Sequence, residues 1–266
     1  MEIKMVEHNN KLSQLVRENM KVVLLDIEGT TTAITFVSET LFPYAKLHLK
    51  DYLQDNWHND QVLNVVSELK IQSEVDKSKY GIEVPQIITT QTRSQKDNAI
   101  NSVVEYVKWQ MSLNQKTIAL KKLQGYIWRD GYHNKEIVGH VYKDVKHVLE
   151  QLKKMGKRLC IYSSGSVEAQ KLLFGHTCSG NMLSLFGGNY DTKFGDKRSA
   201  SSYKKIAECI GCSLQEILFL TDIEEEAVAA IESGMHACIV VRPGNKLIDK
   251  IENYHNITSF TSLIGS

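Results

Sequence analysis

The sequence lacks an excess of charge of either sign, which limits the partners that the protein can bind. Its 32 basic and 31 acidic residues leave a formal net charge of +1. Proteins that bind nucleic acid or anionic membranes through electrostatic attraction carry a basic excess. We therefore expect neither nucleic acid nor membrane among the partners of this chain.

Long apolar runs are absent as well. No stretch approaches the roughly 20 apolar residues of a bilayer-spanning helix, and the first residues, Met1–His8, are too polar for a signal peptide. We therefore expect a soluble protein of the cytoplasm. A monomeric state, and the nucleus as a second candidate compartment, are separate expectations. No internal repeat or low-complexity tract is evident.

Cysteines are few: there are 5, without the spacing of a disulfide framework, which fits a reducing compartment. Cys209 and Cys212 form a C-x-x-C pair, but the chain has no second pair that would complete a tetrahedral zinc site. Gly211, between them, is typical of a helix end. We interpret the pair as structural.

The second half of the chain alternates between apolar runs and helical periods. This pattern predicts a doubly wound parallel sheet, and hence an α/β, Rossmann-like fold. A stretch without a clear period separates Gly175 from Asp196. The expected strands are 22–25, 158–162, 217–220 and 237–241, and the expected helices are 145–152, 167–174, 202–210 and 224–233.

Between the first strand and residue 140 the pattern is helical, apart from a polar interval, Lys70–Lys96, that we expect to be rich in loops. The sequence therefore predicts a catalytic core of residues 1–32 and 140–266, with an all-helical cap, 33–139, inserted after the first strand. An insertion at the carboxyl end of a strand lies above the ligand crevice, as a lid would.

Two acids follow the first strand. Four aliphatic residues, 22–25, deliver Asp26 and Glu28 to a turn that is rich in glycine and threonine. A charge at the end of a buried strand is costly unless a cation or hydrogen-bond donors meet it. The pair indicates a Mg²⁺ site, a phosphoryl acceptor with its acid/base partner, or both.

The ends of the later strands supply further polar groups. Ser163 and Ser164 precede a glycine and a helix N-terminus, an arrangement that can bind phosphate, although these serines could instead only cap the helix. Lys193 and Lys197 compete for the role of a cation. Asp222 follows the next strand, with the acids Glu224, Glu225 and Glu226 behind it. These are the parts that phosphoryl transfer requires.

In this order, Asp26-x-Glu28-Gly29-Thr30, Ser163-Ser164, a downstream lysine and Thr221-Asp222 resemble the haloacid dehalogenase-like phosphatases. Most of that superfamily has Asp-x-Asp at the first site. The Asp-Ile-Glu of this chain resembles the enolase-phosphatase (acireductone synthase) family of methionine salvage. The other runs that are similar to this family are 162–176, 109–113, 219–222 and 241–245.

The resemblance implies a role for each matching residue. It makes Asp26 the nucleophile that becomes an aspartyl-phosphate, and Glu28 its acid/base partner. Both would bind Mg²⁺ together with Asp222. The same resemblance assigns the substrate phosphate to Ser163, Ser164 and Lys197, of which Lys197 follows the glycine as the family motif requires, and it makes Glu226 a candidate partner of the metal site.

The implied reaction is the enolisation and dephosphorylation of 2,3-diketo-5-methylthiopentyl-1-phosphate, which gives the acireductone 1,2-dihydroxy-3-keto-5-methylthiopentene and phosphate. Two alternatives stay open. One is a general small-molecule phosphomonoesterase of the same fold. The other is a phospho-acceptor signalling module, which the large helical insertion argues against. The residue that removes the proton in enolisation is not evident from the sequence.

Overall fold

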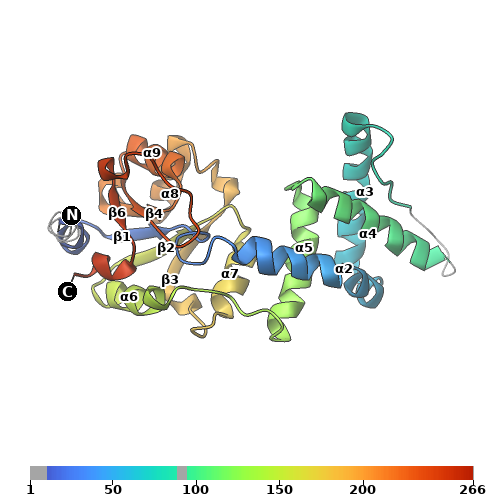
Figure 1. The fold of residues 1–266 in the computed structure, drawn as a ribbon, viewed down its shortest axis with the longest axis horizontal. Coiled ribbons are helices and arrows are strands. Elements are labelled where there is room, and N and C mark those ends of the chain that lie inside the picture. The colour runs from blue at the N-terminus through green and yellow to red at the C-terminus, as the bar shows by residue number, and fades with distance from the viewer. Residues whose placement is uncertain (1–10, 89–94, 266) are drawn as a thin grey trace. The chain divides into compact units, whose positions relative to one another are not determined.

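The structure, a computed structural model, describes residues 11–88 and 95–265 (Figure 1). The expectation for Met1–His8 and part of the predicted polar interval, residues 89–94, lie outside these ranges. Within them, no helix combines the length and apolar character needed to cross a membrane. The chain divides into two compact units, which we call the sheet unit (Met1–Ser38 with Val138–Ser266) and the helical unit (Glu39–Ile137).

In the sheet unit, the described residues form one parallel sheet with the strand order β3-β2-β1-β4-β5-β6. From β1 the order runs through β2 to β3 on one side and through β4 to β6 on the other. In such sheets the ligand crevice lies at the carboxyl ends of the strands, where the order reverses. The strands are β1 (Val22–Leu25), β2 (Arg158–Tyr162), β3 (Phe186–Tyr190), β4 (Ile217–Thr221), β5 (His236–Val240) and β6 (His255–Ile257).

Helices cover both faces of this sheet. Helices α8 (Ala200–Ile210) and α9 (Glu224–Ser233) lie on one face, and α6 (Lys143–Lys154) and α7 (Val167–Gly175) lie on the other (Figure 1). Connections between parallel strands are right-handed, so the direction in which the chain moves across the sheet decides which face each helix covers. The predicted α/β fold with a doubly wound parallel sheet is confirmed.

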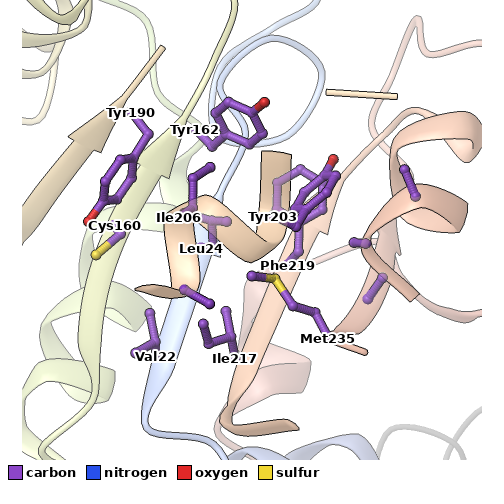
Figure 2. Packing of buried hydrophobic residues seen from close by; sticks show 14 of the residues in the cluster. Val22, Leu24, Cys160, Tyr162, Tyr190, Tyr203, Ile206, Ile217, Phe219 and Met235 are labelled. Atoms are coloured by element: carbon purple, nitrogen blue, oxygen red, sulfur yellow. The ribbon is translucent and has the colours of Figure 1, made fainter. Parts of the chain in front are cut away.

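Alternate strand residues build the core under α8 and α9. Figure 2 shows Tyr162 of β2, Tyr203 of α8 and Phe219 of β4 close together in this core, and the ring centroid of Tyr203 lies 5.5 Å from that of Tyr162 and 5.2 Å from that of Phe219. Leu24 of β1 belongs to the same cluster. Because side chains alternate along a strand, Asp26 is expected to point to the same side as Leu24, toward α8 and α9.

The helical unit contains α2 (Phe42–Asn56), α3 (Asp60–Tyr80), α4 (Lys96–Ser112) and α5 (Ile118–His133). Apolar residues of these helices form its core, for example Leu69 and Val103. A polar group lies in the same core, because the carboxylate of Asp76 on α3 is only 4% exposed.

Two expectations about secondary structure are wrong in part, although residues 81–88 form the predicted loop. The polar interval predicted to be loop-rich begins with a helix, because α3 continues to Tyr80 and ends at Gly81, whose φ is 94°. Ser73 and Asp76 occupy buried positions in this last part of α3, so its inward face does not read as apolar. The stretch between Gly175 and Asp196 contains strand β3, whose sequence Phe-Gly-Gly-Asn-Tyr has no alternation of apolar side chains.

Candidate active site

The turn after β1 brings Asp26 to the carboxyl edge of the sheet. The N–H of Asp26 donates to the carbonyl of Leu220 at 2.9 Å, which extends the pairing of β1 with β4 by one residue. The carbonyl of Ile27 accepts hydrogen bonds from the backbone N–H groups of Thr30, Thr31 and Thr32. This tight turn holds the carboxylate of Asp26 in a buried position, with the residue 5% exposed.

Lys197 is the cation that meets Asp26. Its Nζ lies 2.6 Å from Oδ1 of Asp26 and 2.7 Å from Oε2 of Glu226. Burial by itself lowers the pKa of Lys197, but the two carboxylates outweigh burial and raise that pKa above its usual value. The lysine is therefore charged, and it balances negative charge at the end of β1.

Core tyrosines hold the segment that carries Lys197. The hydroxyl of Tyr203 donates to the carbonyl of Lys197 at 2.6 Å, and the hydroxyl of Tyr162 donates to the carbonyl of Gly195 at 3.0 Å. The aromatic cluster in Figure 2 thus ends in two hydroxyl groups that fix the backbone before α8. Lys193 does not share this position, because its side chain is exposed on the short 3₁₀ turn Thr192–Phe194. Of the two candidate lysines, Lys197 is the one that contacts Asp26.

Glu226, in the first turn of α9, closes the network. The hydroxyl of Thr221 donates to the same Oε2 that contacts Lys197, at 2.7 Å. Burial and the nearby charge of Asp26 raise the pKa of Glu226, and Lys197 opposes this effect. Of the other acids in this turn, Glu225 is exposed and Glu224 accepts a hydrogen bond from Tyr254 at 3.0 Å. Glu226 is therefore the acid of this turn that contacts the candidate site.

Asp222 directly follows β4, and the negative charge of Asp26 acts on its carboxyl group. Burial, and then the charge of Asp26, raise the pKa of Asp222 to about 7. Gly29 packs against it with a φ of 71°, and a Cβ at this position would lie 2.3 Å from Oδ2 of Asp222. Glycine is therefore required here both by the backbone conformation and by the approach of the carboxylate.

The residues at this edge fit a hard divalent cation. Within residues 11–88 and 95–265, no group of three or more His, Cys, Asp or Glu side chains is arranged to hold a metal ion. The two interacting carboxylates, Asp26 and Asp222, nevertheless suit Mg²⁺, which binds one or two carboxylates and keeps several waters. Glu28 is half-buried, and its backbone pairs with Thr32. Its part in binding a metal stays a prediction.

Ser163 and Ser164 lie in the turn after β2, which we call the serine turn, and hydrogen bonds from Gln170 hold this turn in place. Ser163 is buried, its N–H donates to the carbonyl of Tyr190 at 3.2 Å, and Ser164 is exposed. Nε2 of Gln170 donates to the carbonyls of Gly165 (3.0 Å) and Tyr190 (2.8 Å), which ties the turn to the end of β3.

Helix α7 is capped by a third serine. Oγ of Ser166 accepts the N–H of Ala169 at 3.2 Å. The alternative that Ser163 and Ser164 only cap this helix is therefore wrong. The roles proposed for these two serines in binding the substrate remain predictions.

Two residues near the site were not singled out by sequence reasoning. Gln170 holds the serine turn, and Nδ2 of Asn245 donates to the carbonyl of Gly29 at 2.8 Å. A weak signal existed for Asn245, because it lies on the loop that leaves the carboxyl end of β5, although it does not follow the strand directly as Asp26, Ser163 and Asp222 follow theirs. Gln170 gave no comparable signal, since a polar residue inside a helix is usually solvated.

Comparison with known sequences agrees with the family resemblance of the motifs. The sequence model of haloacid dehalogenase-like hydrolases matches residues 20–234. Enolase-phosphatase E1 of Danio rerio is 46% identical over 250 residues, which cover 93% of this chain and 96% of that protein. Enolase-phosphatase E1 of Branchiostoma floridae is 40% identical over 254 residues, which cover 92% of this chain and 84% of that protein.

Solved structures share the fold. The Unknown transcript 4 protein of Saccharomyces cerevisiae matches with a TM-score of 0.70 and 30% identity, over 91% of this chain and 98% of that one. A 2-haloacid dehalogenase of Pseudomonas syringae matches with a TM-score of 0.53 and 13% identity, over 92% of this chain and 96% of that one. At that identity the second likeness shows the fold alone.

Proposed function

Because the chain belongs to the enolase-phosphatases, a family of haloacid dehalogenase-like hydrolases, we propose that it converts 2,3-diketo-5-methylthiopentyl-1-phosphate into the acireductone 1,2-dihydroxy-3-keto-5-methylthiopentene and phosphate. The reaction belongs to methionine salvage. Similarity along nearly the whole length of the relatives supports the choice of reaction. The observation that carries the chemistry is the buried contact between Asp26 and Lys197.

In this proposal Asp26 is the nucleophile. A carboxylate oxygen of Asp26 forms a bond to phosphorus while the bond from phosphorus to the substrate oxygen breaks, and Glu28 supplies the proton to that oxygen. Water then attacks the aspartyl-phosphate, and Glu28 takes a proton from it. Lys197 neutralises charge that would otherwise repel the phosphate from Asp26, and the serine turn at Ser163 and Ser164 binds the remaining phosphate oxygens.

Asp26 and Asp222 would hold Mg²⁺, with Glu28 as a third ligand. When bound, the ion would neutralise negative charge on the phosphate and on the enolate. Enolisation requires the loss of a proton from the phosphate-bearing carbon before phosphate leaves. We assign no residue to that step. The small phosphorylated diketone is the proposed partner, and the cytoplasm, the nucleus and a monomeric state remain predictions from the sequence.

A product assay tests the proposal. The enediol absorbance and free phosphate are followed together in the wild type and in Asp26→Asn, each with and without Mg²⁺. We expect both signals in the wild type with Mg²⁺ and neither after chelation. Asp26→Asn should keep enolisation but lose phosphate release by roughly 10³-fold or more, because the amide is a poor nucleophile. Equal loss of both signals would mean that Asp26 serves both steps.

The same assay separates the alternatives. A general phosphomonoesterase of this fold would hydrolyse simple sugar phosphates at least as fast as the diketone phosphate. A phospho-acceptor signalling module would form a long-lived phosphoprotein in place of steady phosphate release. Preferential turnover of the diketone phosphate, with an enediol product, would exclude both.

A further inference from the structure

Asn245 lies on the loop after β5, and hydrogen bonds fix the orientation of its side-chain amide. Nδ2 donates to the carbonyl of Gly29 at 2.8 Å and to the carbonyl of Val240 at 3.1 Å. An amide group has two N–H donors, and here both face carbonyl oxygens, which can only accept. The hydrogen-bond network therefore identifies the nitrogen end, and Oδ1 lies on the opposite side of the amide carbon.

This oxygen is buried and has no hydrogen-bond partner. Leaving a buried acceptor unsatisfied costs roughly 1–3 kcal/mol. Such atoms are rare in native proteins, and an ordered water or an ion commonly accounts for them. The position of Oδ1 therefore points to a donor that binds there in the working protein.

The unpaired oxygen lies near a carboxylate of the candidate metal site. A Cβ on Gly29 would lie 3.0 Å from Oδ1 of Asn245 and 2.3 Å from Oδ2 of Asp222, so these two oxygens are at most 5.3 Å apart, the sum of the two distances. When Asp222 is ionised, neither oxygen can donate a hydrogen bond to the other. One water that donates to both, at about 2.8 Å each, holds its two acceptors about 4.5 Å apart because of its bond angle. This span lies within the upper limit on the separation of the two oxygens, so one water can bridge them from a position other than the crowded Cβ position of Gly29.

We propose that Asn245 is a positioning residue whose Oδ1 accepts a hydrogen bond from a water of the hydrated Mg²⁺ at Asp222. The inference rests on the proposed function, which assigns Mg²⁺ to Asp26 and Asp222. Mg²⁺ retains several waters when protein carboxylates bind it, and groups that orient such ligands tune the affinity of the site. Through Nδ2 the same side chain also anchors Gly29, in the turn that carries Glu28.

Mg²⁺ affinity without substrate tests the proposal. Isothermal titration of Mg²⁺ alone is carried out on the wild-type chain, Asn245→Ala and Asn245→Asp. We expect about tenfold weaker binding in Asn245→Ala, the lower end of the effect of losing such a partner. Asn245→Asp should bind at least as tightly as the wild type, because it keeps an acceptor oxygen and adds negative charge.

Asn256→Ala is the matched control. Asn256 on β6 also donates through Nδ2 to two carbonyls, those of Ile251 and Tyr254. Its loss should leave Mg²⁺ affinity unchanged, and thermal unfolding of every variant checks that it is folded.

Three results would contradict parts of this argument and can be told apart. If the wild type binds no Mg²⁺, the metal assignment in the proposed function fails. If the wild type binds and Asn245→Ala binds equally well, only the role of Asn245 fails. If Asn245→Asp loses affinity together with Asn245→Ala, the anchor to Gly29 accounts for the effect and the acceptor role of Oδ1 is wrong.

Discussion

Asp26 and Asp76 are both buried carboxylates, but different kinds of partner surround them. In the helical unit, both oxygens of Asp76 accept hydrogen bonds from neutral groups: Oδ2 from the hydroxyl of Tyr106 at 2.6 Å and from Nε2 of Gln110 at 3.2 Å, and Oδ1 from Nε2 of Gln72 at 2.9 Å. In the sheet unit, Oδ1 of Asp26 meets the charged Nζ of Lys197 at 2.6 Å.

This is the difference expected between a structural carboxylate and the proposed nucleophile. Neutral donors on both oxygens compensate the buried charge of Asp76, but they leave no oxygen for chemistry. Asp26 is compensated by a cation that Glu226 also shares, in a field that the carboxylate of Asp222 makes more negative. In the proposed function such a cluster would gain stability from a bound phosphate and a divalent cation, whereas the hydrogen bonds around Asp76 already use both of its oxygens.

Among the variants that probe this comparison, removal of the cation is expected to have the largest effect. Lys197→Met leaves Asp26 and Glu226 buried without a counter-charge, and we expect kcat for phosphate release to fall roughly 10²- to 10³-fold. Breaking a buried pair in this way also destabilises proteins by about 3–5 kcal/mol. This loss should be greatest at alkaline pH and fade as the pH falls, because protons then neutralise the two carboxylates. Steady-state kinetics and urea unfolding at several pH values measure both effects.

Lys193→Met is the control for this variant. Lys193 lies four residues before Lys197 but its side chain is exposed, so we expect wild-type activity and stability. Loss of activity in Lys193→Met with normal activity in Lys197→Met would reverse the assignment of the cation.

Asp76→Ala should destabilise the helical unit and leave kcat nearly unchanged. The variant leaves buried donors without an acceptor, which we expect to cost roughly 2–4 kcal/mol and to lower Tm by roughly 4–16 °C. The kcat should stay within about twofold of the wild type, because the three donors to the Asp76 carboxylate are all residues of the helical unit. Glu74→Ala, at an exposed position of α3, is the matched control and should change Tm little. A loss of kcat as large as that of Lys197→Met would end the distinction between the two carboxylates.

Sequence reasoning gathered the candidate residues that follow predicted strands. Asp26 and Asp222 could be placed together because parallel strands bring their carboxyl ends to one edge of the sheet. Lys197 was chosen over Lys193 from the family resemblance, because the strand before it, β3, was not predicted. The order of apolar runs was sufficient to predict strands such as β2, whose residues are buried on both faces. Neither the placing of residues at strand ends nor the prediction of these strands required any knowledge of side-chain packing.

The parts that could not be foreseen depend on contacts between distant residues. The carboxylate of Asp76 is buried because donors on α3 and α4 meet it, and no periodicity in α3 reveals those donors. Strand β3 is stabilised by pairing with β2, although its two glycines carry no strand signal. The unpaired oxygen of Asn245 becomes visible only when the loop after β5 is folded against Gly29.

The smallest expected effect concerns the proton that competes with the metal at Asp222. Because the pKa of this carboxyl is raised to about 7, a proton occupies it at pH 6 and Mg²⁺ must displace that proton. Mg²⁺ affinity should therefore be about tenfold weaker at pH 6 than at pH 8. The raised pKa favours the folded metal-free protein at low pH, and this contribution is lost as the pH rises through 7, so added Mg²⁺ should raise Tm more at pH 8.

Titration calorimetry at both pH values measures the affinity, with Asp222→Asn as the control that should lose most of it. Affinity that does not change with pH would mean that Asp222 carries no proton to displace, and its carboxylate would then be satisfied within the protein as that of Asp76 is.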